Sequence, residues 1–324
     1  MTRRLSLEEA TDLAARAARA AGLSDEAALS LARATVSADA HGKSAIGFGH
    51  LPDYLIAARE GRIDGAAEPI ITSPAPAAIH CDARGGIAQV GFDRVFDDLS
   101  RRAQTFGIAL FAEKGSYTTG ELGYYPRRLA EAGMVALAAT SGPALMTVAG
   151  ARKPLYCTNP LAFAAPVADG PPLLIDQASS ATAYVELRRY ADRGEALPPG
   201  WAVDADGKPT TDPNAALRGA LLAFGGARGA NIALLVEVMA AGLAGANWAL
   251  DAPSFTSGDR SPGAGLTVIA IAPALLMPDF PSRLKLELDR LARAGVHIPG
   301  RRTAAAAIEL PDELLGEIER AAAA

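Results

Sequence analysis

The stretch from residue 173 to residue 236 is the most informative part of this sequence. It begins with Leu-Leu-Ile-Asp-Gln-Ala-Ser-Ser (173–180), continues with a polar segment (200–213), and reaches Phe-Gly-Gly-Ala-Arg-Gly (224–229) just before an apolar run (230–241). A carboxylate at a strand end is thus followed by a polar loop and by a glycine-flanked arginine at a helix start. This combination suits an anionic cofactor, because the free amides of a helix N-terminus attract phosphate groups.

Each part of this stretch also has a plainer interpretation. The turn from Gly225 to Gly229 could simply lead the chain into a helix, and Asp176 or Ser179 could only cap the next helix. The segment from Trp201 to Pro213 is predicted to be a loop of successive turns, and its length inside a compact domain favours a functional role. These residues alone leave both interpretations open.

The overall composition indicates a folded protein that acts on small molecules. With 324 residues, of which 50% are hydrophobic, the chain can bury a large core. Its formal charge of −5 argues against a nucleic-acid partner, since such proteins usually carry a basic surface. We therefore expect a small-molecule partner.

The cysteines and the N-terminus predict a location in the cytoplasm. Cys81 and Cys157 lie far apart and form neither a Cys-x-x-Cys pair nor a disulfide framework. The N-terminus lacks an apolar signal core, and no stretch reaches the ~18 apolar residues of a membrane helix. A membrane partner is therefore not expected.

Neither a metal site nor a nucleophilic triad is expected. The histidines, at positions 41, 50, 80 and 297, include no pair at the i, i+4 spacing of a zinc-binding helix. No serine or cysteine lies in the Gly-x-Ser-x-Gly turn of many hydrolases. His50, at the start of a predicted helix, is a candidate acid or anion ligand, with a surface or capping role as the alternative.

The order of the predicted elements indicates an α/β protein with helical ends. Capping residues and apolar spacing predict helices over residues 6–22, 24–40 and 51–60. Short apolar runs between Ile70 and Ile175, and again at 266–271, alternate with helical stretches at 89–106 and 121–132 and predict strands. Further helices are predicted at 282–294 and 311–323.

This order predicts three parts. We expect a helical N-terminal segment (1–75), an α/β cofactor-binding domain with a central mixed sheet (76–280) and a helical C-terminal segment (281–324). The two helical segments are expected to pack together, because chain termini often lie close to each other.

Two further polar turns are candidate binding sites. Thr158-Asn159-Pro160 precedes the predicted strand at 161–165, and Ser-Tyr-Thr-Thr-Gly (116–120) follows the strand at 108–112. Their hydroxyl and amide groups suit contacts with a ligand, while an ordinary turn and a helix cap are the alternatives.

Taken together, these residues resemble the malate/L-lactate dehydrogenase type-2 superfamily, whose nicotinamide-binding fold is unrelated to the Rossmann domain. No convincing Gly-x-Gly-x-x-Gly fingerprint is present. The resemblance runs through nearly the whole chain and is carried by residues 157–160, 175–180, 200–213 and 225–229, where the family usually has Lys in place of Arg228. It implies an α/β fold of the non-Rossmann type, NADPH or NADH as cofactor, and a homodimer.

The departures from the family lie where its histidines stand. In much of the family, a Gly is followed three residues later by Ser-His-Gly and then by x-x-Arg-Leu-Pro-x-Tyr. Counted from Gly42, this chain instead has Ala-Ile-Gly-Phe-Gly-His-Leu-Pro-Asp-Tyr (45–54), so the Ser-His pair is absent and His50 replaces the Arg. In a second pattern, Ser-Asn-His-Phe-Gly, the histidine has become Thr118.

These departures favour the reduction of an imine over the oxidation of an alcohol. Oxidising a hydroxy acid needs a base for the hydroxyl proton, and two candidate histidines are absent. A protonated C=N bond is already electrophilic, so its reduction needs a directed hydride, a carboxylate anchor and a source for the nitrogen proton. Segments 118–124 and 176–183 resemble the ketimine reductase branch, which reduces Δ1-pyrroline-2-carboxylate to L-proline and its six-membered homologue, Δ1-piperideine-2-carboxylate, to L-pipecolate.

The resemblance also implies roles for individual residues. The expected cofactor contacts are Ser116, Tyr117, Thr158, Asn159, Pro160, Gln177, Ser179, Gly225, Gly226, Arg228 and Gly229. The expected catalytic or substrate-facing residues are His50, Tyr54, Thr118, Glu121, Lys153 and Asp176. Arg188, Arg189 and Lys208 are candidate partners for a 2′-phosphate, so the choice between NADPH and NADH stays open, as do ring size and the residue that protonates nitrogen.

Two other functions stay open at this point. One is a 2-hydroxyacid dehydrogenase on the same fold, against which the missing Ser-His pair counts. The other is a catalytically silent ligand-binding protein, which fits the loss of two family histidines.

Overall fold

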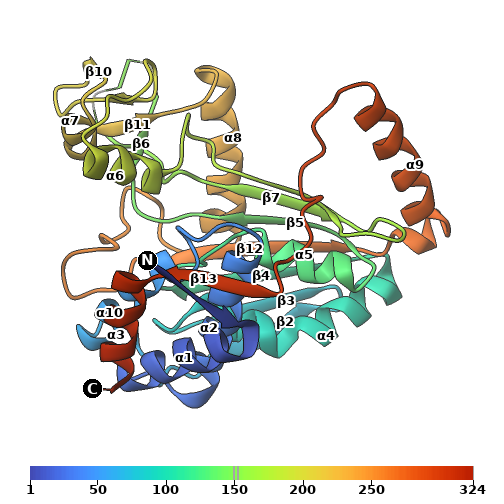
Figure 1. Cartoon of the computed structure of the whole chain (residues 1–324). Helices are drawn as coiled ribbons and strands as arrows, with labels where there is room; N and C mark the ends of the chain where they lie inside the picture. Colours follow the sequence, from blue (N-terminus) through green and yellow to red (C-terminus); the bar gives the residue numbers. More distant parts are fainter. Residues whose placement is uncertain (149, 152, 324) are drawn as a thin grey trace.

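The centre of the structure is a seven-stranded mixed sheet. The computed structural model describes residues 1–148, 150, 151 and 153–323 (Figure 1). Only β3 and β4 run parallel, and all other neighbouring strands of this sheet are antiparallel. In sheet order the strands are β2 (Ile70–Ala75), β3 (Ala78–Asp82), β4 (Ile108–Ser116), β12 (Ala264–Ile271), β5 (Val135–Thr140), β7 (Leu161–Ala165) and β8 (Leu173–Gln177). The predicted mixed α/β class is confirmed.

Helices cover both faces of this sheet because its central strands are apolar on both sides. Ala138 of β5 packs in one cluster with α4 (Ala88–Phe106) and α5 (Tyr124–Glu131), whereas its neighbour Ala139 packs with Val236 and Ala240. Successive strand residues point to opposite faces, so the two clusters lie on opposite sides. The second cluster belongs to α8 (Ala227–Glu237) and the π-helix η2 (Val238–Leu243) that continues it.

The N-terminal and C-terminal parts form one helical layer. Helices α1 (Leu7–Ala20), α2 (Asp25–Ala40), α3 (Leu51–Arg59) and α10 (Asp312–Ala323) share one hydrophobic cluster. The predicted start of α1 is confirmed, since the Glu9 amide donates to the Ser6 hydroxyl at 3.1 Å and the Ser6 amide to the Glu9 carboxylate at 2.8 Å. The prediction of purely helical ends was wrong, because β1 (Thr2–Ser6) pairs with β13 (Ala307–Pro311) across nearly the whole chain.

A smaller sheet lies apart from the central one, in the upper left of Figure 1. Its strands, in order, are β10 (Pro209–Thr210), β9 (Ala202–Val203), β11 (Ala220–Leu222) and β6 (Met146–Thr147). Helices α6 (Tyr184–Arg193) and α7 (Pro213–Arg218) pack on it around Met146, Leu187 and Leu221. The segment from Trp201 to Pro213 is therefore a short hairpin and not only turns, because β9 and β10 pair inside it.

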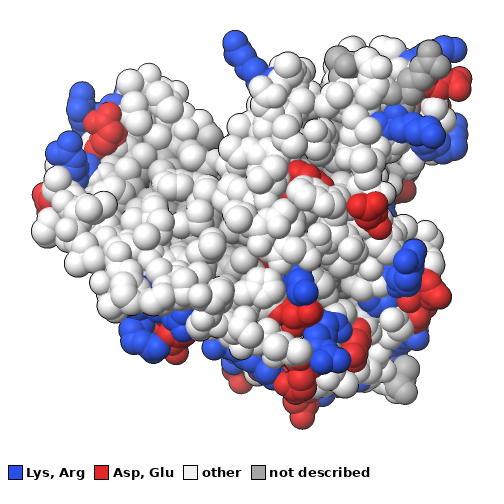
Figure 2. Space-filling view, turned by 180° about the vertical axis from the view of Figure 1, so that it is seen from behind, with Lys and Arg blue, Asp and Glu red and all other residues white. Residues whose placement is uncertain are grey.

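The remaining elements complete the fold, and one face of the molecule carries few charged residues. They are η1 (Phe48–His50), η3 (Pro273–Leu275) and α9 (Phe280–Arg293), the last of which confirms the predicted helix at 282–294. Figure 2 shows a broad face with few charged residues, with the charges gathered at its borders. Among the described residues, we found no helix with the length and apolar character needed to cross a membrane.

Candidate active site

A cavity of about 670 Å³ lies between the N-terminal helical layer, the central sheet and the smaller sheet with its helix α6. Its lining comes from segments 43–53, 117–122, 140–145, 157–160, 176–188 and 249–256. The predicted residues that line it are His50, Tyr117, Thr118, Thr158, Pro160, Asp176 and Gln177. Sequence segments more than 100 residues apart are thus brought together here, as the predicted site requires.

Other predicted residues lie behind the lining or away from it. The predicted residues that are buried next to lining residues are Tyr54, Ser116, Glu121, Asn159 and Ser179. Lys153 is exposed on the smaller sheet's side, and the turn from Gly225 to Gly229 lies beyond Ser179. The Trp201–Pro213 hairpin contributes nothing to the lining among the described residues.

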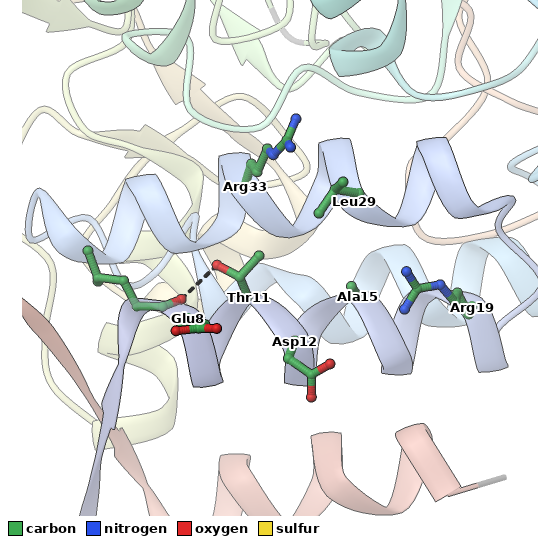
Figure 3. A pocket seen from close by; sticks show the side chains of 8 residues that line it. Glu8, Thr11, Asp12, Ala15, Arg19, Leu29 and Arg33 are labelled. Carbon is green, nitrogen blue, oxygen red and sulfur yellow. Dashed lines mark hydrogen bonds between the residues drawn. The ribbon is translucent and has the colours of Figure 1, made fainter.

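A shallow hollow between α1 and α2 offers no comparable site. Figure 3 shows its lining, in which the Thr11 hydroxyl donates to the Leu7 carbonyl within α1. Arg19 at one end is paired with Asp25 at 2.5 Å. Among the described residues, none of the predicted site residues lines this hollow.

Lys43 is the main lining residue that the sequence interpretation missed. It lies in the turn after α2, and its ammonium contacts the carboxylates of Asp176 and, at 3.2 Å, Glu121. Glu121 also accepts two hydrogen bonds from Arg127, at 3.0 and 2.9 Å. The Gly123 amide donates to Asp176 at 3.1 Å, so the carboxylate is fixed from two sides.

Lys43, Glu121, Arg127 and Asp176 form a network in which each charged group lies beside one of opposite charge. Burial raises the pKa of the Glu121 carboxyl, but Arg127 and Lys43 outweigh burial and lower that pKa overall. Burial would likewise lower the pKa of Lys43, but Asp176 and Glu121 outweigh it and raise that pKa. Two carboxylates and two cations therefore stand together at one end of the cavity.

A second polar group surrounds His50. Its ring Nδ1 is 2.8 Å from the Asp53 carboxylate, and this hydrogen bond lowers the pKa of Asp53. Arg188 of α6 also lines the cavity, with its guanidinium 3.8 Å from Asp53. Tyr54 lies beneath His50 with its ring edge-on, and burial raises the pKa of its phenol. His50 begins α3 without a capping hydrogen bond, so the capping alternative is wrong.

The opposite end of the cavity is built from backbone hydrogen bonds. The Ser179 amide donates to the Thr158 carbonyl at 2.8 Å, and the Phe224 amide donates to the Ser179 carbonyl at 3.0 Å. The cavity wall is thereby joined to the glycine turn before α8. Asp176 lies in β8 and α6 starts only at Tyr184, so the helix-cap alternative for Asp176 and Ser179 is wrong.

The glycine turn has the local geometry of an anion site. Gly225 and Gly226 both have positive φ, 55° and 63°, and Gly226 stands at the start of α8 without a side-chain cap. The first amides of α8 therefore have no capping side chain, and the exposed Arg228 lies beside them. Gly229 is also required, because a Cβ there would lie 2.2 Å from the Phe224 carbonyl oxygen.

Buried side chains hold this end from below. The Asn159 amide donates to the Glu237 carboxylate at 2.7 Å and to the Ala233 carbonyl of α8 at 2.8 Å. The other Glu237 oxygen accepts from the Ala249 amide at 2.7 Å, at the start of segment 249–256. Ser179 donates to the Asn159 carbonyl at 2.7 Å.

We call segments 43–54 and 117–121, with Asp176, the lysine side of the cavity. We call segments 157–160, 177–180 and 224–229 the glycine-turn side. Between them, the buried hydroxyl of Ser141 lines the cavity and has no hydrogen-bond partner among the described residues. A buried hydroxyl of this kind needs a hydrogen-bond partner, which water or a bound ligand can supply.

Comparisons with known proteins show the family and the overall fold. Residues 5–318 match the family model for malate/L-lactate dehydrogenases. A (2R)-3-sulfolactate dehydrogenase (NADP(+)) from Chromohalobacter salexigens is 35% identical over 98% of both chains. A Δ1-pyrroline-2-carboxylate reductase from Ancylobacter novellus is 37% identical over 92% of this chain and 89% of its own. The crystal structure of a Δ1-piperideine-2-carboxylate reductase from Pseudomonas syringae superposes with a TM-score of 0.93 at 33% identity, covering 98% of this chain and 99% of that one.

Proposed function

This chain belongs to the malate/L-lactate dehydrogenase family, and we propose that it is an NAD(P)H-dependent reductase of cyclic ketimine carboxylates. Its substrates would be Δ1-pyrroline-2-carboxylate, reduced to L-proline, and the six-membered Δ1-piperideine-2-carboxylate, reduced to L-pipecolate. Relatives named as reductases of one or both compounds are 32–37% identical to this chain over most of its length.

The residues at the two histidine positions of the family support imine reduction over alcohol oxidation. Ile46 and Thr118, which stand at the two histidine positions of the family pattern, both line the cavity. Among the described lining residues His50 is the remaining histidine, and its Nδ1 is bonded to Asp53. Removing a hydroxyl proton needs a base near the reacting carbon, whereas an imine needs a proton delivered to it. The lining therefore favours C=N reduction.

The glycine-turn side fits a nicotinamide dinucleotide without a Rossmann fingerprint. The uncapped start of α8 and Arg228 would face the phosphates, and Thr158, Gln177 and the unpaired Ser141 hydroxyl would meet polar groups of the nicotinamide end. When bound, the reduced nicotinamide supplies a hydride. The protein's part is to hold the substrate's C=N carbon against it and to exclude water.

The substrate carboxylate would bind at the His50 group. With Nδ1 engaged by Asp53, the Nε2 of His50 is left for the substrate, and Arg188 adds a guanidinium from α6. Arg188 is suited to a carboxylate because the planar guanidinium offers paired N–H donors that match the two carboxylate oxygens. Tyr54 supports the His50 ring from below, while Thr118 would orient the substrate ring.

We also propose that the protein is a cytoplasmic homodimer. Leu234, Leu235, Val238 and Leu243 on α8 and η2 are each about half exposed. Trp248 lies against Gly242 and extends this apolar surface. Apolar patches of this kind favour pairing with a second copy. Light scattering of the wild type should give the mass of a dimer. The variant Leu235→Glu should give a lower mass, whereas the control Leu286→Glu, on α9, should keep the dimer mass.

The cysteines support the cytoplasmic part of this proposal. Cys81 and Cys157 are buried and form no disulfide, which suits a reducing compartment.

The direct test follows NADPH and NADH absorbance with the five- and six-membered ketimines. The same enzyme is assayed in the opposite direction with malate, lactate and 3-sulfolactate, because a relative at 35% identity is named a sulfolactate dehydrogenase. We expect ketimine turnover to exceed hydroxy-acid turnover by at least about 10²-fold in kcat/KM. Faster oxidation of a hydroxy acid would establish the dehydrogenase instead.

A further inference from the structure

A second cavity, of about 650 Å³, lies behind the lysine side of the first. It is lined by the turn after α2, by α5, by β8 with the loop before it and by segment 297–304, and it includes His41, His297 and Arg302. Among the described residues, Lys43 and Asp176 are the two that line both cavities. Their ion pair therefore forms the partition between the candidate active site and a separate solvent-accessible space.

The position of Lys43 on this partition is fixed by the backbone. Its amide donates to the Ala38 carbonyl at 2.9 Å, and its carbonyl accepts from the Ile46 and Gly47 amides, each at 3.0 Å. The turn after α2 thus holds the residue, while 30% of its side chain stays exposed. The ammonium has three N–H groups, so two carboxylate contacts leave one for a ligand.

We infer that Lys43 is the residue that delivers the proton to the substrate nitrogen. This inference rests on the proposed function. As the hydride forms the new C–H bond, the C=N π electrons move to nitrogen, which forms an N–H bond with a Lys43 proton. The Lys43 N–H bond breaks, and the side chain is left as a neutral amine until water in the second cavity returns the proton.

The charged groups around Lys43 favour the return of a proton to its amine after each turnover. A neutral Lys43 would leave the ionised Asp176 and Glu121 facing only Arg127, so the amine is rapidly protonated again. The product is itself an alkyl amine, so the proton passes between two nitrogen bases of the same chemical type.

Competing proton donors in the lining are less suited. The Asp176 and Glu121 carboxylates are ion-paired to Lys43 and offer no proton. The Arg188 guanidinium is assigned to the substrate carboxylate, and the Thr118 hydroxyl is too weak an acid. His50 is tied to Asp53 and is assigned to the carboxylate. Among the charged side chains of the described residues that line this cavity, Lys43 is the remaining proton donor.

The test is chemical rescue of Lys43→Ala. With the five-membered ketimine and saturating NADPH, we expect kcat to fall by at least about 10²-fold, with the nicotinamide still bound by fluorescence titration. Methylammonium should restore turnover, and a series of alkylammonium ions should do so in proportion to their acidity. Tetramethylammonium has the charge but no N–H proton and should restore nothing. Lys114→Ala, at an exposed pair with Asp82, is the matched control and should keep its kcat.

The outcomes separate the two proposals. Equal rescue by tetramethylammonium, or an unaffected kcat in Lys43→Ala, would overturn the proton role while ketimine reduction by the wild type stands. If the wild type reduces 2-keto acids instead, the ketimine function falls, and the same rescue series tests Lys43 on the C=O group, which needs a proton equally. Absence of any wild-type turnover overturns both proposals.

Discussion

The two sides of the cavity are held in different ways. The glycine-turn side is joined by neutral hydrogen bonds, mostly through the backbone, from Thr158 through Ser179 to Phe224. The lysine side is held by charged side chains that pair across long sequence distances, such as Lys43 with Asp176. A ladder of backbone groups tolerates changes in pH and salt, whereas a buried charge network fails when one member is lost. The predictions that follow test this difference.

The largest effect is expected for Arg127→Met on the lysine side. The side chain is buried and forms both guanidinium bonds of Glu121, so its loss leaves a carboxylate with Lys43 alone. We expect about 3–5 kcal/mol of lost unfolding free energy, measured by urea denaturation. The matched control is Arg101→Met, whose pair with Asp98 is exposed and should contribute under about 1 kcal/mol. A similar loss of unfolding free energy in Arg127→Met and Arg101→Met would show that the buried network contributes no more than an exposed ion pair.

His50→Ala should affect activity more than stability. We expect kcat/KM for the ketimine to fall by about 10²-fold or more, because the carboxylate loses its imidazole partner. His80→Gln serves as the control, since His80 contacts the Ala244 carbonyl outside the cavity. Near-wild-type kinetics for His50→Ala would remove this residue from the reaction.

Gly229→Ala tests the glycine-turn side. The added Cβ would meet the Phe224 carbonyl oxygen at 2.2 Å, so the turn must shift away from the Ser179 ladder. We expect the Kd for NADPH to rise by about 10-fold, equivalent to ~1.4 kcal/mol, with little change in the pH profile. Gly316→Ala on α10 meets only the flexible Arg320 and should leave the Kd unchanged.

The smallest effect is the response of stability to alkaline pH. Asp176 and Glu121 raise the pKa of Lys43, so its contribution is complete below the unfolded value of about 10.4 and is lost as pH rises through the folded value. The difference in Tm between the wild type and Lys43→Met should be constant between pH 7 and 10. Above pH 10 this difference in Tm should become smaller. A larger difference in Tm above pH 10 would contradict a stabilising role for the charged Lys43.

The same difference explains what the sequence could predict. Capping residues, apolar spacing and glycines are local signals, so most helices, the main strands and the glycine turn were predicted, whereas α6 and α7 were missed. The β1–β13 pair was missed because each strand has five residues and its partner lies about 300 positions away. Lys43 was missed because its role depends on Glu121 and Asp176, which only the fold brings together. Its place directly after Gly42, inside the altered family pattern, was the available signal.

The buried Glu237 carboxylate also sets how this site can be redesigned. One of its oxygens holds Asn159 beneath the glycine-turn side, and the other holds Ala249, where segment 249–256 begins to cover the cavity. A loop graft that replaced only one of the two segments would leave one Glu237 oxygen buried without a hydrogen-bond donor. The free energy of unfolding would then fall by about 1–3 kcal/mol. The two loops therefore form one exchangeable module with α8.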